Sequence, residues 1–259
     1  MIDGHVHLEY GPLTKEYVLE FVEQAKKMGV TVLHMLDHTH RFQEFAPIYE
    51  ELKEIPCQKA WLDLKVLEPL SVYHQLIEEI KAMDLEVEVR FGLEVCYVPR
   101  HENLIRELVQ AYPYDFMIGS VHSIDGKLYD MVFSKEILWQ AYDVDAIYKR
   151  YYEIIFDLVK SNIFSQLGHV DTVKMFNYYP TYDLTETYHE LAKLLVEHHV
   201  LAENNSRCHY KYKHPELGLA PDLMKILKEH EVSFIASSDG HLPKEVGFYL
   251  KELYQQIEK

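Results

Sequence analysis

The chain begins Met1-Ile2-Asp3-Gly4-His5-Val6-His7-Leu8, a short stretch that carries two histidines two residues apart. Alternate residues of a β-strand point to the same side, so a strand here would place His5 and His7 on one face. Two neighbouring imidazoles bind a metal ion when carboxylates or further histidines approach from elsewhere in the chain. A lone His-X-His pair is more often incidental, so the remaining sequence decides whether this one is a metal site.

Strand and helix patterns alternate along the rest of the chain. Apolar runs typical of buried strands occupy residues 30–36, 85–94, 116–121, 163–168, 200–204 and 232–237. Thr14 and Gly29 are predicted to cap the first helix, and Ser71 is a plausible cap for another. Residues 205–209 are interpreted as a polar loop, and Pro243 is predicted to open the last helix. Seven strands that alternate with helices favour an α/β fold, a parallel barrel of the TIM type.

The chain is predicted to form a single domain over residues 1–259. No Pro/Gly/Ser-rich linker, low-complexity tract or fixed-period repeat divides it. The alternation of strand and helix patterns weakens over residues 123–143. These residues are interpreted as an excursion over one end of the barrel that could form a substrate lid.

Composition limits the classes of partner. The formal net charge of -16 disfavours a nucleic-acid polymer or an anionic membrane as partner, because a polyanion would be repelled. A small anionic substrate stays possible, since bound divalent ions would reverse the charge locally. No apolar run reaches transmembrane length and no signal peptide is recognised, so a cytoplasmic location is expected. The 3 cysteines are too scattered to predict disulfides or a zinc knuckle.

Ionisable residues lie at or just beyond the ends of the predicted strands. They are His5, His7, His38, Glu94, His122, His169, Asp239 and His241. The carboxyl ends of parallel barrel strands meet at one rim, where these side chains would converge. Each alone is more simply a hydrogen-bonded histidine or a helix cap. Eight such residues together are unlikely to be only hydrogen-bonded histidines and helix caps, because buried parallel strands normally avoid ionisable residues.

Mixed imidazole and carboxylate ligands favour zinc, manganese or iron, and their number implies two or three divalent ions. Glu94 is the natural bridge, because its two oxygens can bind neighbouring ions. Two ions about 4 Å apart lower the pKa of a shared water and stabilise charge on an attacked ester. The sequence carries no nucleophile elbow, phosphate-binding glycine loop or Cys/His nucleophile pattern that would indicate another chemistry.

The ordered motifs resemble those of the polymerase-and-histidinol-phosphatase (PHP) superfamily, and within it the histidinol-phosphatase branch. The matching segments are His5-Val6-His7, Asp37-His38, Gly92-Leu93-Glu94-Val95, Ser120-Val121-His122, Gly168-His169 and Ser238-Asp239-Gly240-His241. The resemblance implies a distorted seven-stranded barrel with a trinuclear metal centre. It also implies hydrolysis of L-histidinol phosphate to L-histidinol and phosphate, a step of histidine biosynthesis.

The resemblance further implies a set of ligands for each ion. One metal would be held by His5, His7, Glu94 and Asp239. A second would be held by Glu94, His122 and His169. His38 and His241 would contribute to a third, and Glu94, Asp239 and His241 would form the catalytic centre.

Two segments depart from the pattern of the family. Family members commonly carry a further histidine shortly after the first motif, whereas this chain has Leu8-Glu9-Tyr10-Gly11-Pro12. Either Glu9 replaces that ligand or the third site is weakened or lost. After the sixth strand, Arg207 and His209 are candidate substrate contacts, although Arg207 could equally be an exposed loop residue. Asp171, His209 and a metal-bound water are candidates for the leaving-group acid.

The leading hypothesis is therefore a metal-dependent phosphatase that acts on L-histidinol phosphate. A second hypothesis keeps the site and changes the substrate to another small phosphomonoester or a nucleotide-derived phosphodiester. A third is a non-catalytic regulatory or binding module that retains some metal ligands. The nearly complete ligand set argues against the third, because a degenerate relative would be expected to have lost several of them.

Overall fold

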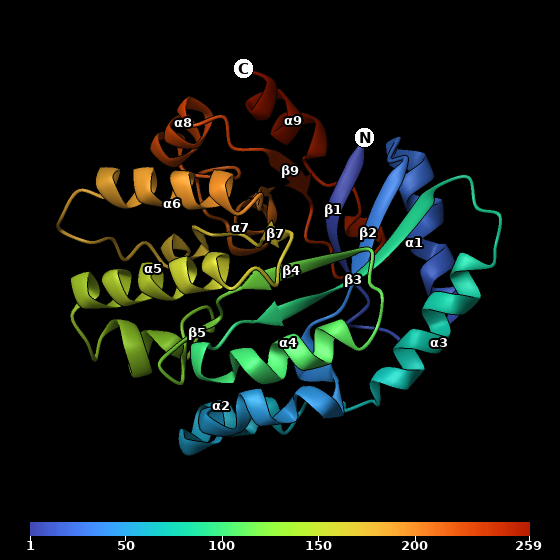
Figure 1. Ribbon diagram of the computed structural model, residues 1–259, viewed down its shortest axis with the longest axis horizontal. Coiled ribbons are helices and arrows are strands. Elements are labelled where there is room, and N and C mark those ends of the chain that lie inside the picture. Colours follow the sequence, from blue (N-terminus) through green and yellow to red (C-terminus); the bar gives the residue numbers. More distant parts are fainter.

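Seven parallel strands form the central sheet of the computed structural model, which describes residues 1–259 (Figure 1). Their order is β1 (Ile2–His7), β2 (Val32–Leu36), β3 (Glu88–Cys96), β4 (Phe116–Ser120), β7 (Gln166–Leu167), β8 (Leu201–Asn205) and β9 (Phe234–Ser237). The two ends of the sheet meet where His7 N donates to Gly240 O at 2.8 Å. The sheet is thus a distorted seven-stranded barrel, as predicted.

Helices surround the strands in Figure 1. They are α1 (Lys15–Met28), α2 (Pro56–Leu62), α3 (Leu70–Lys81), α4 (Glu102–Gln110), α5 (Val144–Lys160), α6 (Thr185–Glu197), α7 (Arg207–Tyr212), α8 (Pro221–Glu229) and α9 (Leu250–Glu258). Segments of 3-10 helix cover Thr39–Arg41, Gln43–Glu54, Pro99–His101, Thr172–Lys174 and Pro243–Glu245, and a π-helix covers Lys135–Trp139. No helix is both long enough and apolar enough to cross a lipid bilayer.

The first helix has the caps that the sequence predicts. The Thr14 side chain accepts a hydrogen bond from Tyr17 N, and Gly29 ends the helix at φ 72°, a left-handed conformation that favours glycine. Val18 and Phe21 are buried on its inner face. Local sequence therefore determines both ends of α1.

Three predicted boundaries are wrong, because hydrogen bonds and turns that the sequence pattern did not reveal set the ends of these elements. Ser71 does not cap α3, which begins at Leu70, and the Leu70 N–H donates to the Glu44 carboxylate at 3.0 and 3.1 Å. The predicted loop 205–209 contains the start of α7, where Arg207 N donates to Asn205 Oδ1 at 2.8 Å. Pro243 opens only a 3-10 turn, since Gly247 takes a positive φ of 79° before α9.

The predicted fifth strand is also shorter than expected. Residues 163–168 were expected to be a strand, and only Gln166–Leu167 pair as β7. The Ser165 hydroxyl accepts the Met117 N–H at 3.1 Å, where a backbone carbonyl would accept it in a regular ladder.

The excursion at residues 123–143 packs against the barrel. It contains the hairpin strands β5 (Ser123–Ile124) and β6 (Lys127–Leu128) and the π-helix. Gln58 binds the hairpin through Gly126 O at 2.9 Å and Leu128 N at 2.7 Å. Leu128, Asp130 and Met131 line the pocket described below, so the excursion forms one wall of it. Its movement as a lid stays a prediction.

Candidate metal centre

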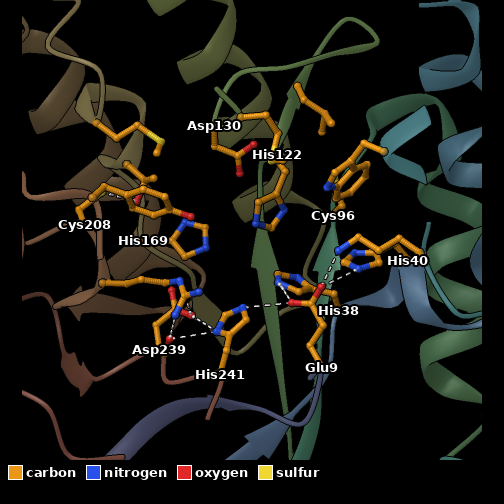
Figure 2. Close-up of a pocket in the computed structure, with 18 of the residues that line it drawn as sticks. Glu9, His38, His40, Cys96, His122, Asp130, His169, Cys208, Asp239 and His241 are labelled. Atoms are coloured by element: carbon orange, nitrogen blue, oxygen red, sulfur yellow. Dashed lines mark hydrogen bonds and ion pairs between the residues drawn. The ribbon is translucent and has the colours of Figure 1, made fainter. Parts of the chain in front are cut away.

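The carboxyl ends of the strands bring the sequence-predicted ligands together. His38, His122, His169, Asp239 and His241 line one pocket (Figure 2), and His5, His7 and Glu94 lie buried in contact with them. Strand β1 supplies His5 and His7 and strand β3 supplies Glu94, all fully buried. The segments that follow other strands supply the remaining ligands, namely His38, His122, His169, Asp239 and His241. The barrel topology therefore gathers residues that are up to 236 positions apart in the sequence, from His5 to His241.

Glu94 lies at the centre of the cluster, and its two oxygens face two different sets of imidazoles. Oε1 is 2.8 Å from His169 Nε2 and 3.3 Å from His122 Nε2. Oε2 faces three other rings, with the nearest nitrogen 2.8 Å away for His38 and 3.3 Å away for both His5 and His7. A carboxylate that faces two ligand sets has the geometry of a bridge between two ions.

The cluster has the features of a site built for cations. Oε2 of Glu94 is buried and lacks a partner in hydrogen-bonding geometry. His5 Nε2 and His7 Nε2 lie 2.8 Å apart, and His7 Nε2 lies 3.4 Å from Asp239 Oδ1. Buried ligand atoms without hydrogen bonds are rare in folded proteins. The residues therefore fit divalent ions, with one candidate group formed by His5, His7 and Asp239.

The pKa shifts differ from one candidate ligand to another. Despite burial, Glu203 raises the pKa of His5 and Glu94 raises the pKa of His122 well above the usual value, so a metal ion must displace a proton from these two rings. Burial alone would raise the pKa of Glu94, but His38, His5 and His122 outweigh burial and hold the pKa well below its usual range. Burial, assisted by His241 and His38, lowers the pKa of His7 well below its usual value. Without ions, Glu94 is thus ionised and His7 neutral, which are the ligand forms that bind metals.

Glu203 on strand β8 orients His5 and was missed at the sequence level. Its carboxylate lies 2.9 and 3.2 Å from His5 Nδ1 and accepts from Asn205 Nδ2 at 2.8 Å and His169 N at 3.0 Å. With Nδ1–H donated to Glu203, the other nitrogen of His5 presents its lone pair to the cluster. Carboxylates behind metal-binding histidines commonly have this role. An acidic residue inside a buried strand was the available sequence signal.

Glu9 reaches the cluster from the loop after β1. Its Oε2 lies 3.2 Å from His241 Nε2 and 3.7 Å from His38 Nε2. Figure 2 shows Glu9 between the rings of His38, His40 and His241. The loop that lacks a histidine therefore places a carboxylate beside the two side chains expected at a third site.

Arg207 lines the pocket beside Asp239. Its Nη1 donates to Asp239 O at 2.7 Å, and the side chain is largely buried rather than an exposed loop residue. Arg207 thus brings a fixed positive charge to the pocket wall.

The structure places His209 outside the lining of the pocket, so the substrate contact predicted for it gains no support. His209 Nδ1 interacts with His214 O at 2.9 Å, and the ring packs against Tyr249, outside the lining of the pocket. Residues 207–212 form a helix, so Cys208 and Tyr212, four residues apart, face the pocket and His209 points elsewhere.

Asp171 is likewise held by other groups. It accepts from Lys174 Nζ at 2.6 Å and from Ala220 N at 2.7 Å. These contacts assign it a structural role in joining the segment after β7 to the start of α8.

Asp130 is a second pocket residue missed at the sequence level. It lies in the excursion, and its carboxylate is directed into the pocket above His122 in Figure 2. No lysine, arginine or histidine nitrogen lies within 4.0 Å of this carboxylate. The pocket therefore contains an acidic group that has no cationic partner from the protein.

The family model and the most similar proteins indicate the same protein family. The PHP domain family model matches residues 3–207. A Deinococcus radiodurans protein described as a probable histidinol-phosphatase is 26% identical over 263 residues, which cover 99% of this chain and 92% of that protein. The histidinol-phosphatase of Bacillus subtilis is 23% identical over 265 residues, covering 95% of each.

The fold has solved relatives. The crystal structure of histidinol phosphate phosphatase from Lactococcus lactis, in complex with zinc, L-histidinol and phosphate, matches with a TM-score of 0.69 at 20% identity. The match covers 99% of this chain and 92% of that one. This likeness confirms the barrel architecture.

Proposed function

The chain belongs to the PHP domain family, and from this premise we propose that it is a metal-dependent phosphatase that hydrolyses L-histidinol phosphate to L-histidinol and phosphate. The central observation is Glu94, whose two oxygens face separate sets of imidazoles. The names of the Deinococcus radiodurans and Bacillus subtilis relatives support this substrate.

The proposed centre holds two or three divalent ions of zinc, manganese or iron. His5, His7, Glu94 and Asp239 would hold the first, and Glu94, His122 and His169 the second. Glu9, His38 and His241 would contribute to the third. Such ions, when bound, activate water at neutral pH and neutralise charge on a phosphate group.

The side chains of the protein perform the remaining tasks. Glu203 holds Nδ1–H of His5 and so keeps Nε2 directed at the cluster. Arg207 contributes a positive charge beside Asp239. From there its guanidinium group would donate hydrogen bonds to the phosphate oxygens of the substrate. Buried Glu94 and Asp239 stay ionised, because neighbouring histidines hold the pKa of each well below its usual range despite burial.

Asp130 supports a substrate with a cationic alcohol. Histidinol phosphate carries an ammonium group on the part that leaves, and the Asp130 carboxylate in the pocket has no cationic partner from the protein. A charge-assisted hydrogen bond between them would contribute about 1.5–3 kcal/mol. Asp130→Asn should raise KM for histidinol phosphate about tenfold or more, and leave KM for p-nitrophenyl phosphate unchanged. Equal changes for both substrates would reject this role.

The function is tested by phosphate release after chelation and reloading with manganese or zinc. Histidinol phosphate should be hydrolysed with the highest kcat/KM in a panel of sugar, nucleotide and amino-alcohol phosphates. If histidinol phosphate ranks among the poorest substrates, the proposed substrate is wrong. Less than one bound ion per chain together with no hydrolysis would instead favour a binding module.

A further inference from the structure

The Glu9 carboxylate is surrounded by four nitrogen atoms from four side chains. Oε2 faces His241 Nε2 at 3.2 Å and His38 Nε2 at 3.7 Å. Oε1 faces His40 Nε2 at 3.3 Å and Lys65 Nζ at 2.6 Å. The Glu9 side chain is only 10% exposed, so this is a largely desolvated cluster of one acid with three imidazoles.

His40 is the member of this cluster that the motifs do not account for. It lies in the 3-10 turn Thr39–Arg41 after β2, two residues beyond His38, and the two rings stack with centroids 4.9 Å apart. Trp61 packs against the outer side of His40, with ring centroids 5.4 Å apart. His40 is 7% exposed. The packing therefore fixes the ring with Nε2 directed at Glu9.

We propose that His40 is a ligand of the third metal ion, completing a set of one carboxylate and three imidazoles with Glu9, His38 and His241. Four is the number of ligands that a tetrahedral zinc ion takes. His40 and His241 face different oxygens of Glu9, so a bound ion would have to draw these two rings closer together. The loop after β1 lacks a histidine, and the turn after β2 supplies an additional imidazole from the other side of the site. This inference rests on the proposed metal centre and is independent of the identity of the phosphorylated substrate.

Lys65 gives the third site a second property. Its ammonium group lies on the Glu9 oxygen that faces His40, and it also lies 4.7 Å from the centroid of the Trp61 ring. A cation that binds Glu9 must displace this ammonium or share the carboxylate with it, and the two positive charges repel each other. Lys65 therefore competes with the third ion and makes that ion the most weakly bound of the three.

The test is a titration of the metal-stripped full chain with zinc and, separately, with cobalt, with ions counted by elemental analysis and cobalt ligation followed by visible absorption. Wild type should bind three ions, the last most weakly. His40→Gln should weaken the third ion at least tenfold and leave two ions unchanged, and His40→Phe should repeat this effect with the ring packing retained. Lys65→Met should tighten the third ion.

His74 provides a matched control, because it is a partly exposed histidine that stacks on Tyr112 away from the pocket. His74→Gln should bind three ions as wild type does. Three ions of unchanged affinity in both His40 variants would overturn the assignment of His40. An unchanged third ion in Lys65→Met would overturn the competition. A wild-type chain that binds only two ions would overturn the whole inference, yet phosphate release from histidinol phosphate would still support the proposed function.

Discussion

Replacing Glu203 by glutamine should weaken metal binding without disrupting the fold. All the groups that contact this carboxylate are hydrogen-bond donors, namely His5 Nδ1–H, Asn205 Nδ2–H and His169 N–H. Oε1 accepts from Asn205 and Oε2 accepts from the His169 backbone, and both oxygens are within reach of His5. A glutamine has only one oxygen, so its NH2 group must face at least one of these donors.

The magnitude follows from these contacts. An amide turned against a buried donor leaves that donor unpaired, which costs about 1–3 kcal/mol. Loss of the negative charge also makes His5 a weaker base and frees its ring to turn. Carboxylates that support metal-binding histidines are worth about 10–100-fold in metal affinity, or about 1.4–2.7 kcal/mol. We therefore expect Glu203→Gln to weaken the ion held by His5 by about 10–100-fold.

The assay is a competition titration of zinc against a chromophoric chelator, with the melting temperature of the metal-free protein measured in parallel. Glu23→Gln is a matched control, because Glu23 is 62% exposed on α1. Its zinc affinity should equal that of wild type. If Glu203→Gln also binds zinc with wild-type affinity while it is folded, then Glu203 does not support His5 and the reasoning is refuted.

Two further substitutions test the bridge and the packing around the barrel. Glu94→Gln should lose at least one ion by elemental analysis and slow phosphate release about 100-fold or more, since it removes the bridging charge; wild-type turnover would contradict the assignment. His34 is buried against Phe116 with both ring nitrogens unpartnered, and burial, assisted by Arg90, lowers its pKa from 6.5 to about 4. Between these values the unfolded chain binds more protons than the folded one, so wild type should lose stability as pH falls from 7 to 4, by at most about 3 kcal/mol from this residue. His34→Leu should therefore be more stable than wild type in urea unfolding, with an advantage larger at pH 5 than at pH 7; a constant difference would show that His34 does not titrate this way.

Much of the fold follows from local patterns. The caps of α1 at Thr14 and Gly29 were predictable, because a threonine hydroxyl and a glycine with positive φ act within a few residues of the helix end. Boundaries set by remote groups were not predictable. The Glu44 carboxylate accepts a hydrogen bond from the Leu70 N–H at the start of α3, 26 residues further along the chain. No residue near Ser71 indicates that this contact forms.

The sequence by itself predicted the candidate ligands, because a parallel barrel puts every strand end at one rim and the residues there carry imidazoles and carboxylates. His5 and His7 share a face through the two-residue period of β1, which is a property of the strand alone. Only the tertiary structure decided which other side chains contact those candidate ligands. Glu203 meets His5 across 198 residues, and Lys65 meets Glu9 across 56. Such contacts depend on the closure of the barrel and on the path of the loops that connect its strands. The spacing of residues within one strand or helix cannot predict them.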